Sequence, residues 1–173
     1  EVQGLLNELG YGERIAYVTT GHGELSWQGG NRALLQRGLK GFKDDLKKLG
    51  FTLKPLGLRQ DLGQKVPDDA DVVMILGPLA PFQQAEVDSI RRYVESGGSV
   101  LIAFETDFMR QANGISGADP LHDMVRDVLG VQTGPGVLAG EKAIYPMARD
   151  NKDRLNVITN SFTSHASSRT IAE

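Results

Sequence analysis

Cysteine is absent from this chain of 173 residues. Its absence excludes a disulfide framework, a cysteine nucleophile, thiolate zinc sites and iron–sulfur clusters. Concentrated positive charge is missing as well, because the net charge is −3 and no run of lysine or arginine exceeds two residues. Nucleic acid and anionic membrane surfaces both require such charge, so neither is expected as a partner.

Long apolar runs are also lacking. No stretch approaches the roughly 18–20 residues that cross a bilayer, and no signal peptide is present. The apolar content of 40% and the charged content of 24% are typical of a folded globular domain. Because the chain opens at Glu1 without a methionine and stops at Glu173, we expect a single α/β domain, residues 1–173, excised from a larger membrane-tethered protein.

Short apolar runs alternate with segments of helical periodicity. Strands are predicted at 14–20, 51–58, 71–77 and 99–104, and helices at 31–49, 82–96 and 120–129. This alternation predicts βαβ units and a mainly parallel sheet, in a three-layer sandwich of the flavodoxin-like kind. Pro55 places strand 51–58 at a sheet edge, whereas the other three strands are apolar enough to be covered on both faces. Two further short strands are predicted at 141–147 and 155–159.

Two of the helices carry a clear apolar face. The first begins at Asn31 as N-cap and directs Leu35, Leu39, Phe42, Leu46 and Leu49 to one side. The other opens at Asp119-Pro120, ends at Gly130 and directs Leu121, Met124, Val125, Val128 and Leu129 inward. His122 then falls on the outer face, where we expect it to be solvated.

The most informative stretch follows the first strand and reads Thr20-Gly21-His22-Gly23-Glu24. In a flavodoxin-like strand order, the carboxyl ends of strands 14–20 and 71–77 form the topological switch point where ligands bind. The second of these strands ends at Gly77-Pro78. We therefore expect the glycine-flanked loop to face Gly77-Pro78, with positive φ angles at Gly21 and Gly23.

Three kinds of chemistry fit this loop poorly. A dinucleotide site needs GxGxxG running directly into a helix, but four residues (27–30) intervene here, and no P-loop motif is present. A hydrolase needs a nucleophile on the turn after a strand, and Gly77-Pro78-Leu79 offers none. His22, His122 and His165 lack the close spacing of a local metal site. No cofactor and no metal are therefore predicted.

Two interpretations of the loop stay open. In the first, His22 and Glu24 form a polar recognition surface, joined by Glu105 at the end of strand 99–104 and by His165. In the second, the loop is a structural turn whose histidine satisfies backbone carbonyls. A rival from another class is a hydrolase or transferase that uses His22 with Glu24 or Glu105.

Four segments resemble a known family. "AYVTTGHGE" resembles the opening, and "VPDDADVVMILGPLAPFQQAEVDSIRRYVESGGSVLIAFE" the central block, of the auxiliary component of gliding-motility-type ABC transporters, the GldG-like family. "LGVQTGPGVL" and "ITNSFTSHASSRTI" resemble its later segments. The resemblance spans roughly residues 14–171, and it rests on the order and spacing of all the segments. Glu105 departs from it, because relatives more often carry Asp there, and the helix from Pro120 is short.

The resemblance implies an extracytoplasmic (periplasmic) domain held at the cell membrane by helices outside this segment. Its implied partners are an ABC permease, an ATPase and sibling auxiliary subunits, with a small-molecule ligand as a further possibility. The implied fold is similar to flavodoxin-like and class I glutamine amidotransferase-like domains. Since amidotransferases need a cysteine that this chain lacks, a non-catalytic ligand- or partner-binding function is predicted. A purely structural assembly module is the third alternative.

Overall fold

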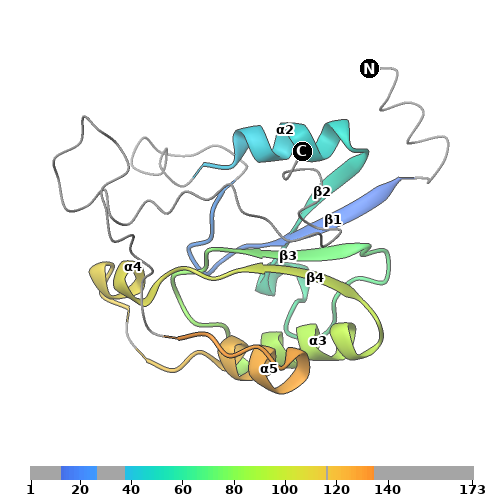
Figure 1. The fold of residues 1–173 in the computed structure, drawn as a ribbon. Coiled ribbons are helices and arrows are strands. Elements are labelled where there is room, and N and C mark those ends of the chain that lie inside the picture. Colours follow the sequence, from blue (N-terminus) through green and yellow to red (C-terminus); the bar gives the residue numbers. More distant parts are fainter. Residues whose placement is uncertain (1–12, 27–37, 116, 135–173) are drawn as a thin grey trace, which may run out of the picture. The chain divides into compact units, whose positions relative to one another are not determined.

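Four parallel strands form the centre of the domain (Figure 1). The computed structural model describes residues 13–26, 38–115 and 117–134. The strands are β1 (Arg14–Thr19), β2 (Phe51–Leu56), β3 (Val72–Leu76) and β4 (Ser99–Ala103). They are hydrogen-bonded in the order β2-β1-β3-β4, all in parallel, as in the first four strands of the flavodoxin-like order 2-1-3-4-5. The predicted strands at 141–147 and 155–159 lie outside the described residues.

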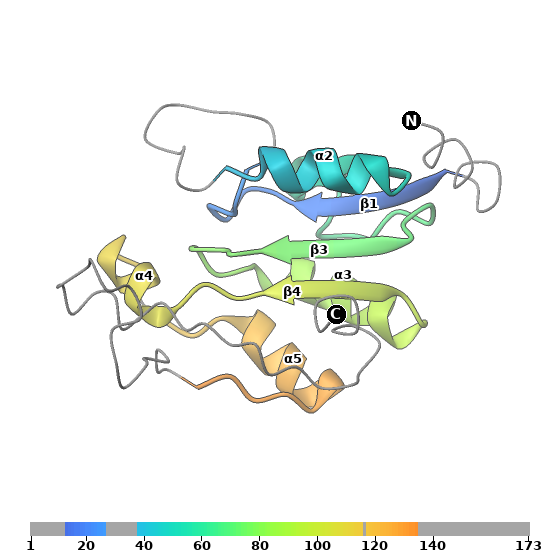
Figure 2. The same ribbon diagram turned by 45° about the horizontal axis from the view of Figure 1, so that its top comes forward.

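Helices cover the two faces of this sheet. α2 (Lys40–Lys48) lies on one face, while α3 (Gln84–Glu95) and α5 (Pro120–Leu129) lie on the other (Figures 1 and 2). The short elements η2 (Leu58–Gln60) and α4 (Asp107–Ala112) follow β2 and β4. The predicted three-layer α/β sandwich is confirmed. All described residues belong to one compact unit, and a single domain over residues 1–173 stays a prediction.

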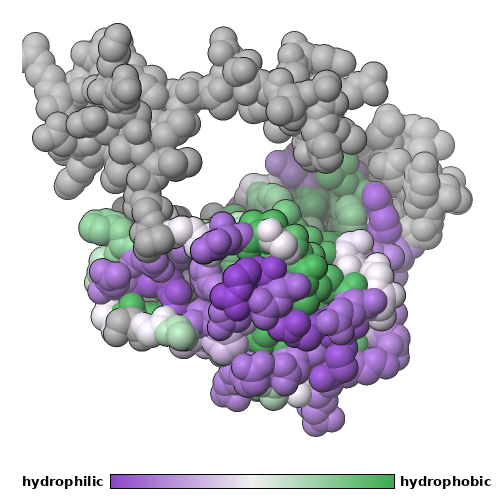
Figure 3. Space-filling model, turned by 60° about the horizontal axis from the view of Figure 1, so that its bottom comes forward, coloured by the Kyte–Doolittle hydropathy of each residue, from purple (hydrophilic) through white to green (hydrophobic). Residues whose placement is uncertain are grey.

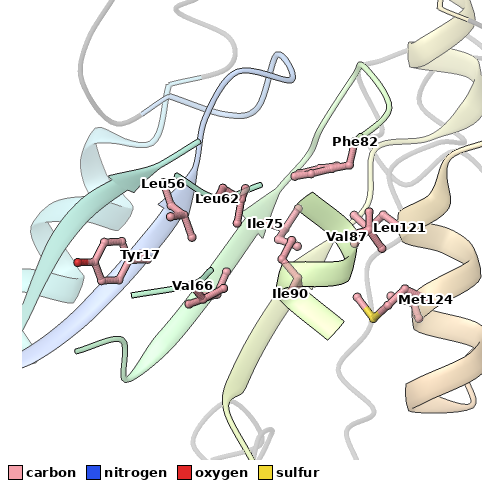
Figure 4. Close-up of a cluster of buried hydrophobic side chains, with 12 residues drawn as sticks. Tyr17, Leu56, Leu62, Val66, Ile75, Phe82, Val87, Ile90, Leu121 and Met124 are labelled. Atoms are coloured by element: carbon pink, nitrogen blue, oxygen red, sulfur yellow. The ribbon is translucent and has the colours of Figure 1, made fainter. Parts of the chain in front are cut away.

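The strands alternate their side chains between two apolar clusters, because successive strand residues point to opposite faces. On the α3 and α5 side, Tyr17, Val73 and Ile75 meet Val87, Ile90, Leu121 and Met124 (Figure 4). On the α2 side, Ala16, Val18, Met74 and Leu76 meet Leu46. β1 and β3 are therefore covered on both faces, which is why their sequences are continuous apolar runs.

α2 covers the later part of the predicted helix 31–49. It begins at Lys40, with Leu39 as its N-cap, and Gly38 before it forms an isolated bridge with Ser26. Asn31, the predicted N-cap, lies outside the described residues. Leu46 is buried, but Phe42 and Leu49 are exposed. Leu39 and Leu49, which belong to the predicted apolar spacing, are the N-cap and the C-cap of α2, so periodicity alone carried the predicted helix past both ends of α2.

β4 differs from the prediction of a strand covered on both faces. Its burial alternates, and Leu101 on the α2 side is 45% exposed. β4 is the outer strand of the described sheet, and α2 packs over β2, β1 and β3 instead. Val100 and Ile102 pack into the α3 and α5 side. An apolar sequence therefore does not by itself mean that both faces are covered.

The last two helices also refine the prediction. α5 is capped by the Asp119 side chain and ends at Gly130, as predicted, but Leu129 is exposed at its end. α4 was not predicted from sequence; its start is capped by the Thr106 hydroxyl, which accepts a hydrogen bond from the Met109 amide. The outer surface on the α3 and α5 side is mostly hydrophilic (Figure 3). Among the described residues, no helix combines the length and apolar character that crossing a bilayer requires.

Replacing Ile90 with Ala should lower the free energy of unfolding by about 2–5 kcal/mol. Ile90 is fully buried between α3 and the sheet, so its truncation leaves a cavity. Leu101→Ala is the matched control on an exposed strand position, with an expected loss of less than about 1 kcal/mol. Chemical denaturation of the two variants measures both values. Equal losses would contradict the burial of Ile90 and the exposure of Leu101.

Candidate functional site

The carboxyl ends of the parallel strands are tied together by backbone hydrogen bonds. The Thr20 amide, just after β1, donates to Leu56 O of β2 at 2.8 Å. The Leu25 amide donates to Leu76 O of β3 at 2.8 Å. The loop from Thr20 to Ser26 therefore reaches from the β1–β2 pair to the end of β3, which is the predicted switch-point position.

The glycines let this loop turn tightly against the segment after β3. Gly21 and Gly23 have φ angles of 116° and 72°, the left-handed region that was predicted for them. The carbonyl of His22 accepts hydrogen bonds from the amides of Leu79 (2.8 Å) and Ala80 (2.9 Å). The contact with the β3 end thus runs through the two residues that follow Gly77-Pro78.

The side chain of His22 is buried, with 7% of the residue exposed. Its Nδ1 lies 3.1 Å from Glu24 Oε1 and its Nε2 lies 3.0 Å from Glu86 Oε2. The ring stacks on Phe82, with centroids 3.9 Å apart and planes at 17°. The imidazole is therefore enclosed on both ring nitrogens and on one face.

Both carboxylates have further backbone partners. Glu24 Oε2 accepts from the His22 amide at 2.7 Å, which closes a compact ring within the loop. Glu86 Oε2 accepts from the Gln83 amide at 2.9 Å, as part of the capping box that begins α3. Glu86 is fully buried, and its Oε1 has no hydrogen-bond partner among the described residues. Two buried negative charges therefore converge on one imidazole.

This geometry favours the protonated ring. A neutral imidazole has one N–H, whereas both ring nitrogens here face carboxylate oxygens that only accept. Burial is the largest influence on the pKa of His22 and lowers it, but the hydrogen bond to Glu24 and the charge of Glu86 together raise the pKa above its ordinary value. Burial is also the largest influence on the pKa of Glu24, and for this acid it raises the pKa. The hydrogen bond to His22 and the nearby backbone donors lower the pKa of Glu24 by more, so that it lies below its ordinary value.

Glu86 was missed in the sequence prediction, which proposed Glu105 as the second carboxylate. Glu105 is half-buried after β4, and its Oε1 accepts from the Thr106 amide at 3.0 Å. The Gln83-x-x-Glu86 spacing is visible in the sequence as a capping box. Nothing in that spacing points to a histidine 64 residues away. His165 lies outside the described residues.

A second polar cluster lies behind the loop. Arg110 of α4 is buried and donates from Nε to Leu79 O at 3.1 Å. Its Nη2 lies 3.8 Å from Asp119 Oδ2. Asp119 Oδ1 accepts from the amides of Leu121 (3.0 Å) and Phe82 (3.4 Å). Through Leu79 and Phe82, this cluster holds the same segment that contacts His22.

Two cavities border the loop. One, of about 380 Å³, is lined by Thr20, Gly21, His22, Pro55, Gly57, Leu58, Arg59 and Gln60. The other, of about 230 Å³, is lined by Thr19, Thr20, Gly21, Gly23, Glu24, Leu25 and Ser26. We call residues 20–26 and 57–60 together the rim. A larger cavity of about 490 Å³ lies elsewhere, between segment 64–68 and the end of α3.

His122 was predicted to be solvated; it is half-buried and has partners within the protein. Its ring stacks on Phe104 at a centroid distance of 4.1 Å, and its Nδ1 lies 2.6 Å from Thr133 Oγ1. His122 therefore packs α5 against Phe104, the residue after β4. Within the described ranges, no group of three or more His, Asp or Glu side chains is arranged to hold a metal ion.

The His22 cluster predicts a bell-shaped pH dependence of stability. Because the pKa of His22 is raised on folding, its contribution is complete below the ordinary value of 6.5 and is lost as pH rises through the folded-state pKa. Because the pKa of Glu24 is lowered, its contribution is complete above 4.5 and is lost as pH falls. The cluster therefore stabilises most between these two values.

Comparing the wild type with His22→Gln by denaturation at a series of pH values tests this. We expect a difference of about 1.5–3 kcal/mol between pH 5 and 6.5, the range for hydrogen bonds to charged groups, and a smaller one at pH 9. His122→Gln is the matched control, since its ring contacts Phe104 and Thr133 rather than carboxylates. A difference for His22→Gln that does not change with pH would contradict the charged cluster.

Gly57 sets how closely the two halves of the rim approach. A Cβ at this position would lie 2.5 Å from the carbonyl oxygen of Thr20. Gly57→Ala should therefore displace the rim and lower the free energy of unfolding by about 1–3 kcal/mol. Gly41→Ala in α2, where nothing lies within 4 Å, should be neutral or stabilising by up to about 1 kcal/mol. Thermal unfolding of the pair distinguishes them, and equal behaviour would rule out the close approach.

Comparison with known proteins places the chain in a family. Residues 13–165 match a family model described as an ABC-type uncharacterized transport system. No match is found among curated proteins or among solved structures. The matched range includes the whole rim, the His22 cluster and every described strand. The chain therefore belongs to the ABC-type uncharacterized transport system family, and its role lies in the auxiliary part of such a system.

Proposed function

We propose that this chain is a non-catalytic binding domain of an ABC transport auxiliary protein and that the rim is its recognition surface. The observation that carries the proposal is the His22 cluster, which holds the loop in place between two cavities. A loop fixed by buried charges costs little further ordering when a partner binds to it, so it is well suited to recognition.

The same cluster argues against the rival enzyme. A general base must reach its substrate proton with a free nitrogen. Both nitrogens of His22 already contact carboxylate oxygens, and Phe82 covers one face of the ring. His22 therefore acts as a structural cation here, and recognition falls to the groups that the rim exposes. Arg59 and Gln60 are exposed and line the larger of the two rim cavities.

We extend this proposal to a more specific family, location and set of partners. The match to the transport family and the resemblance of the quoted segments both favour a GldG-like auxiliary component on the extracytoplasmic side of the membrane. Its partners would be an ABC permease, an ATPase or a sibling auxiliary subunit, and a small molecule is the alternative ligand. The site set would comprise Thr20, Gly21, His22, Gly23, Glu24, Gly77, Pro78, Glu105 and His165. Within it, the buried His22 and Glu24 shape the rim.

The proposal is tested by replacing both Arg59 and Gln60 with Ala in the full-length protein and assaying that protein in its native membrane. We expect reduced transport or reduced co-purification of the permease and ATPase, with the unfolding temperature nearly unchanged because both side chains are exposed. The matched control is Asp45→Ala with Lys48→Ala, an exposed ion pair on α2. Wild-type transport and wild-type co-purification in the rim variant would overturn the proposal and favour an assembly module that uses another surface.

A further inference from the structure

His22 connects the loop after β1 with a segment that is distant in sequence, the turn after β3 and the start of α3. Its backbone carbonyl accepts from Leu79 and Ala80 in the segment after β3. Its ring contacts Glu86 on α3 at 3.0 Å and stacks on Phe82 just before that helix. The contact between His22 Nε2 and Glu86 Oε2 joins the His22 side chain of the loop to α3.

One proton decides whether this connection is attractive. With both ring nitrogens protonated, each N–H points to a carboxylate oxygen. When one proton leaves, one nitrogen presents a lone pair to an acceptor, and that contact becomes repulsive. Glu86 would lose its counter-charge while fully buried, with Oε1 already lacking a partner. A buried charge that loses its partner is strongly destabilising, so the local structure has to change.

We propose that His22 is a pH-sensitive latch, and that loss of its proton releases the Thr20–Ser26 loop from α3 and reshapes the two cavities beside it. The latch is closed at acidic pH and opens as pH rises through the titration of His22. Its consequence for recognition rests on the proposed function of the rim. On that basis, the protein would present its binding surface in one form at acidic pH and in another at alkaline pH.

The charged groups around His22 agree with this assignment. They are Glu24 in the loop, Glu86 on α3, Arg59 at the shared cavity, and Arg110 and Asp119 behind Leu79 and Phe82. Histidine is the residue type whose ordinary pKa lies closest to neutrality, so the latch is assigned to the ring of His22. The two carboxylates raise the pKa of His22 against the effect of burial, which moves the opening towards more alkaline pH.

Hydrogen exchange of the 173-residue chain tests the latch. The probes are the amides of Leu25, Leu79 and Ala80, which hold the loop or donate to it, and the amide of Ile75 in the core strand as internal reference. After correction for intrinsic exchange rates, we expect protection at the three loop probes to fall several-fold across the titration of the His22 ring. That titration is followed by NMR of the imidazole in the same sample. Protection of Ile75 should fall by no more than the change in global stability that denaturation measures over the same pH range.

Two variants make the test specific. Glu86→Gln removes one neighbouring charge, so the ring should titrate at lower pH and loop protection should fall at that lower pH. In His22→Gln the loop protection should no longer depend on pH. Should this second variant fail to fold, the wild-type and Glu86→Gln titrations still decide the matter.

Loop protection that stays constant while the ring titrates would overturn the latch, as would a loss of protection shared equally with Ile75. These measurements do not involve a partner. They can therefore fail while the co-purification experiment on Arg59 and Gln60 succeeds, and the reverse also holds.

Discussion

The imidazole of His22 between Glu24 and Glu86 is the interaction on which the arrangement at the carboxyl end of the sheet depends. Two carboxylates taken from water cost far more than their hydrogen bonds return unless a cation lies between them. The protonated ring supplies that cation, and Phe82 excludes water from one of its faces. The loop after β1, the turn after β3 and the first turn of α3 are consequently fixed as one unit.

The sheet was predictable because strands that are buried on both faces have continuous apolar sequences. β1 and β3 are covered on both faces, so each is a continuous apolar run bounded by polar residues or glycine. Pro55 lies on the outer strand β2, where a missing N–H leaves no ladder bond unmade. The positive φ angles at Gly21 and Gly23 were predictable from the residue type, because few residues other than glycine adopt such angles in a crowded turn.

The partners of His22 were not predictable, because a contact across 64 residues depends on how α3 is placed on the sheet. Glu86 has the sequence pattern of an ordinary capping residue, and that function is real. The contact of the same oxygen, Oε2, with His22 forms only when Phe82 and the loop are brought beside α3. Arg110 is a similar case, since its bond to Leu79 O joins α4, which was not predicted at all, to the segment after β3.

The inward orientation of His22 and Glu24 changes what the loop can offer to a partner. A histidine flanked by glycines suggests a reactive group at first sight, yet here its polar atoms are used within the protein. The surface that remains consists of the exposed backbone at Gly21 and Gly23, together with Arg59 and Gln60 across the cavity. On the proposed function, such a surface would recognise the shape and the hydrogen-bonding groups of a partner. Because the buried charges hold the backbone that forms it, a change in the protonation of one ring acts on the whole surface at once.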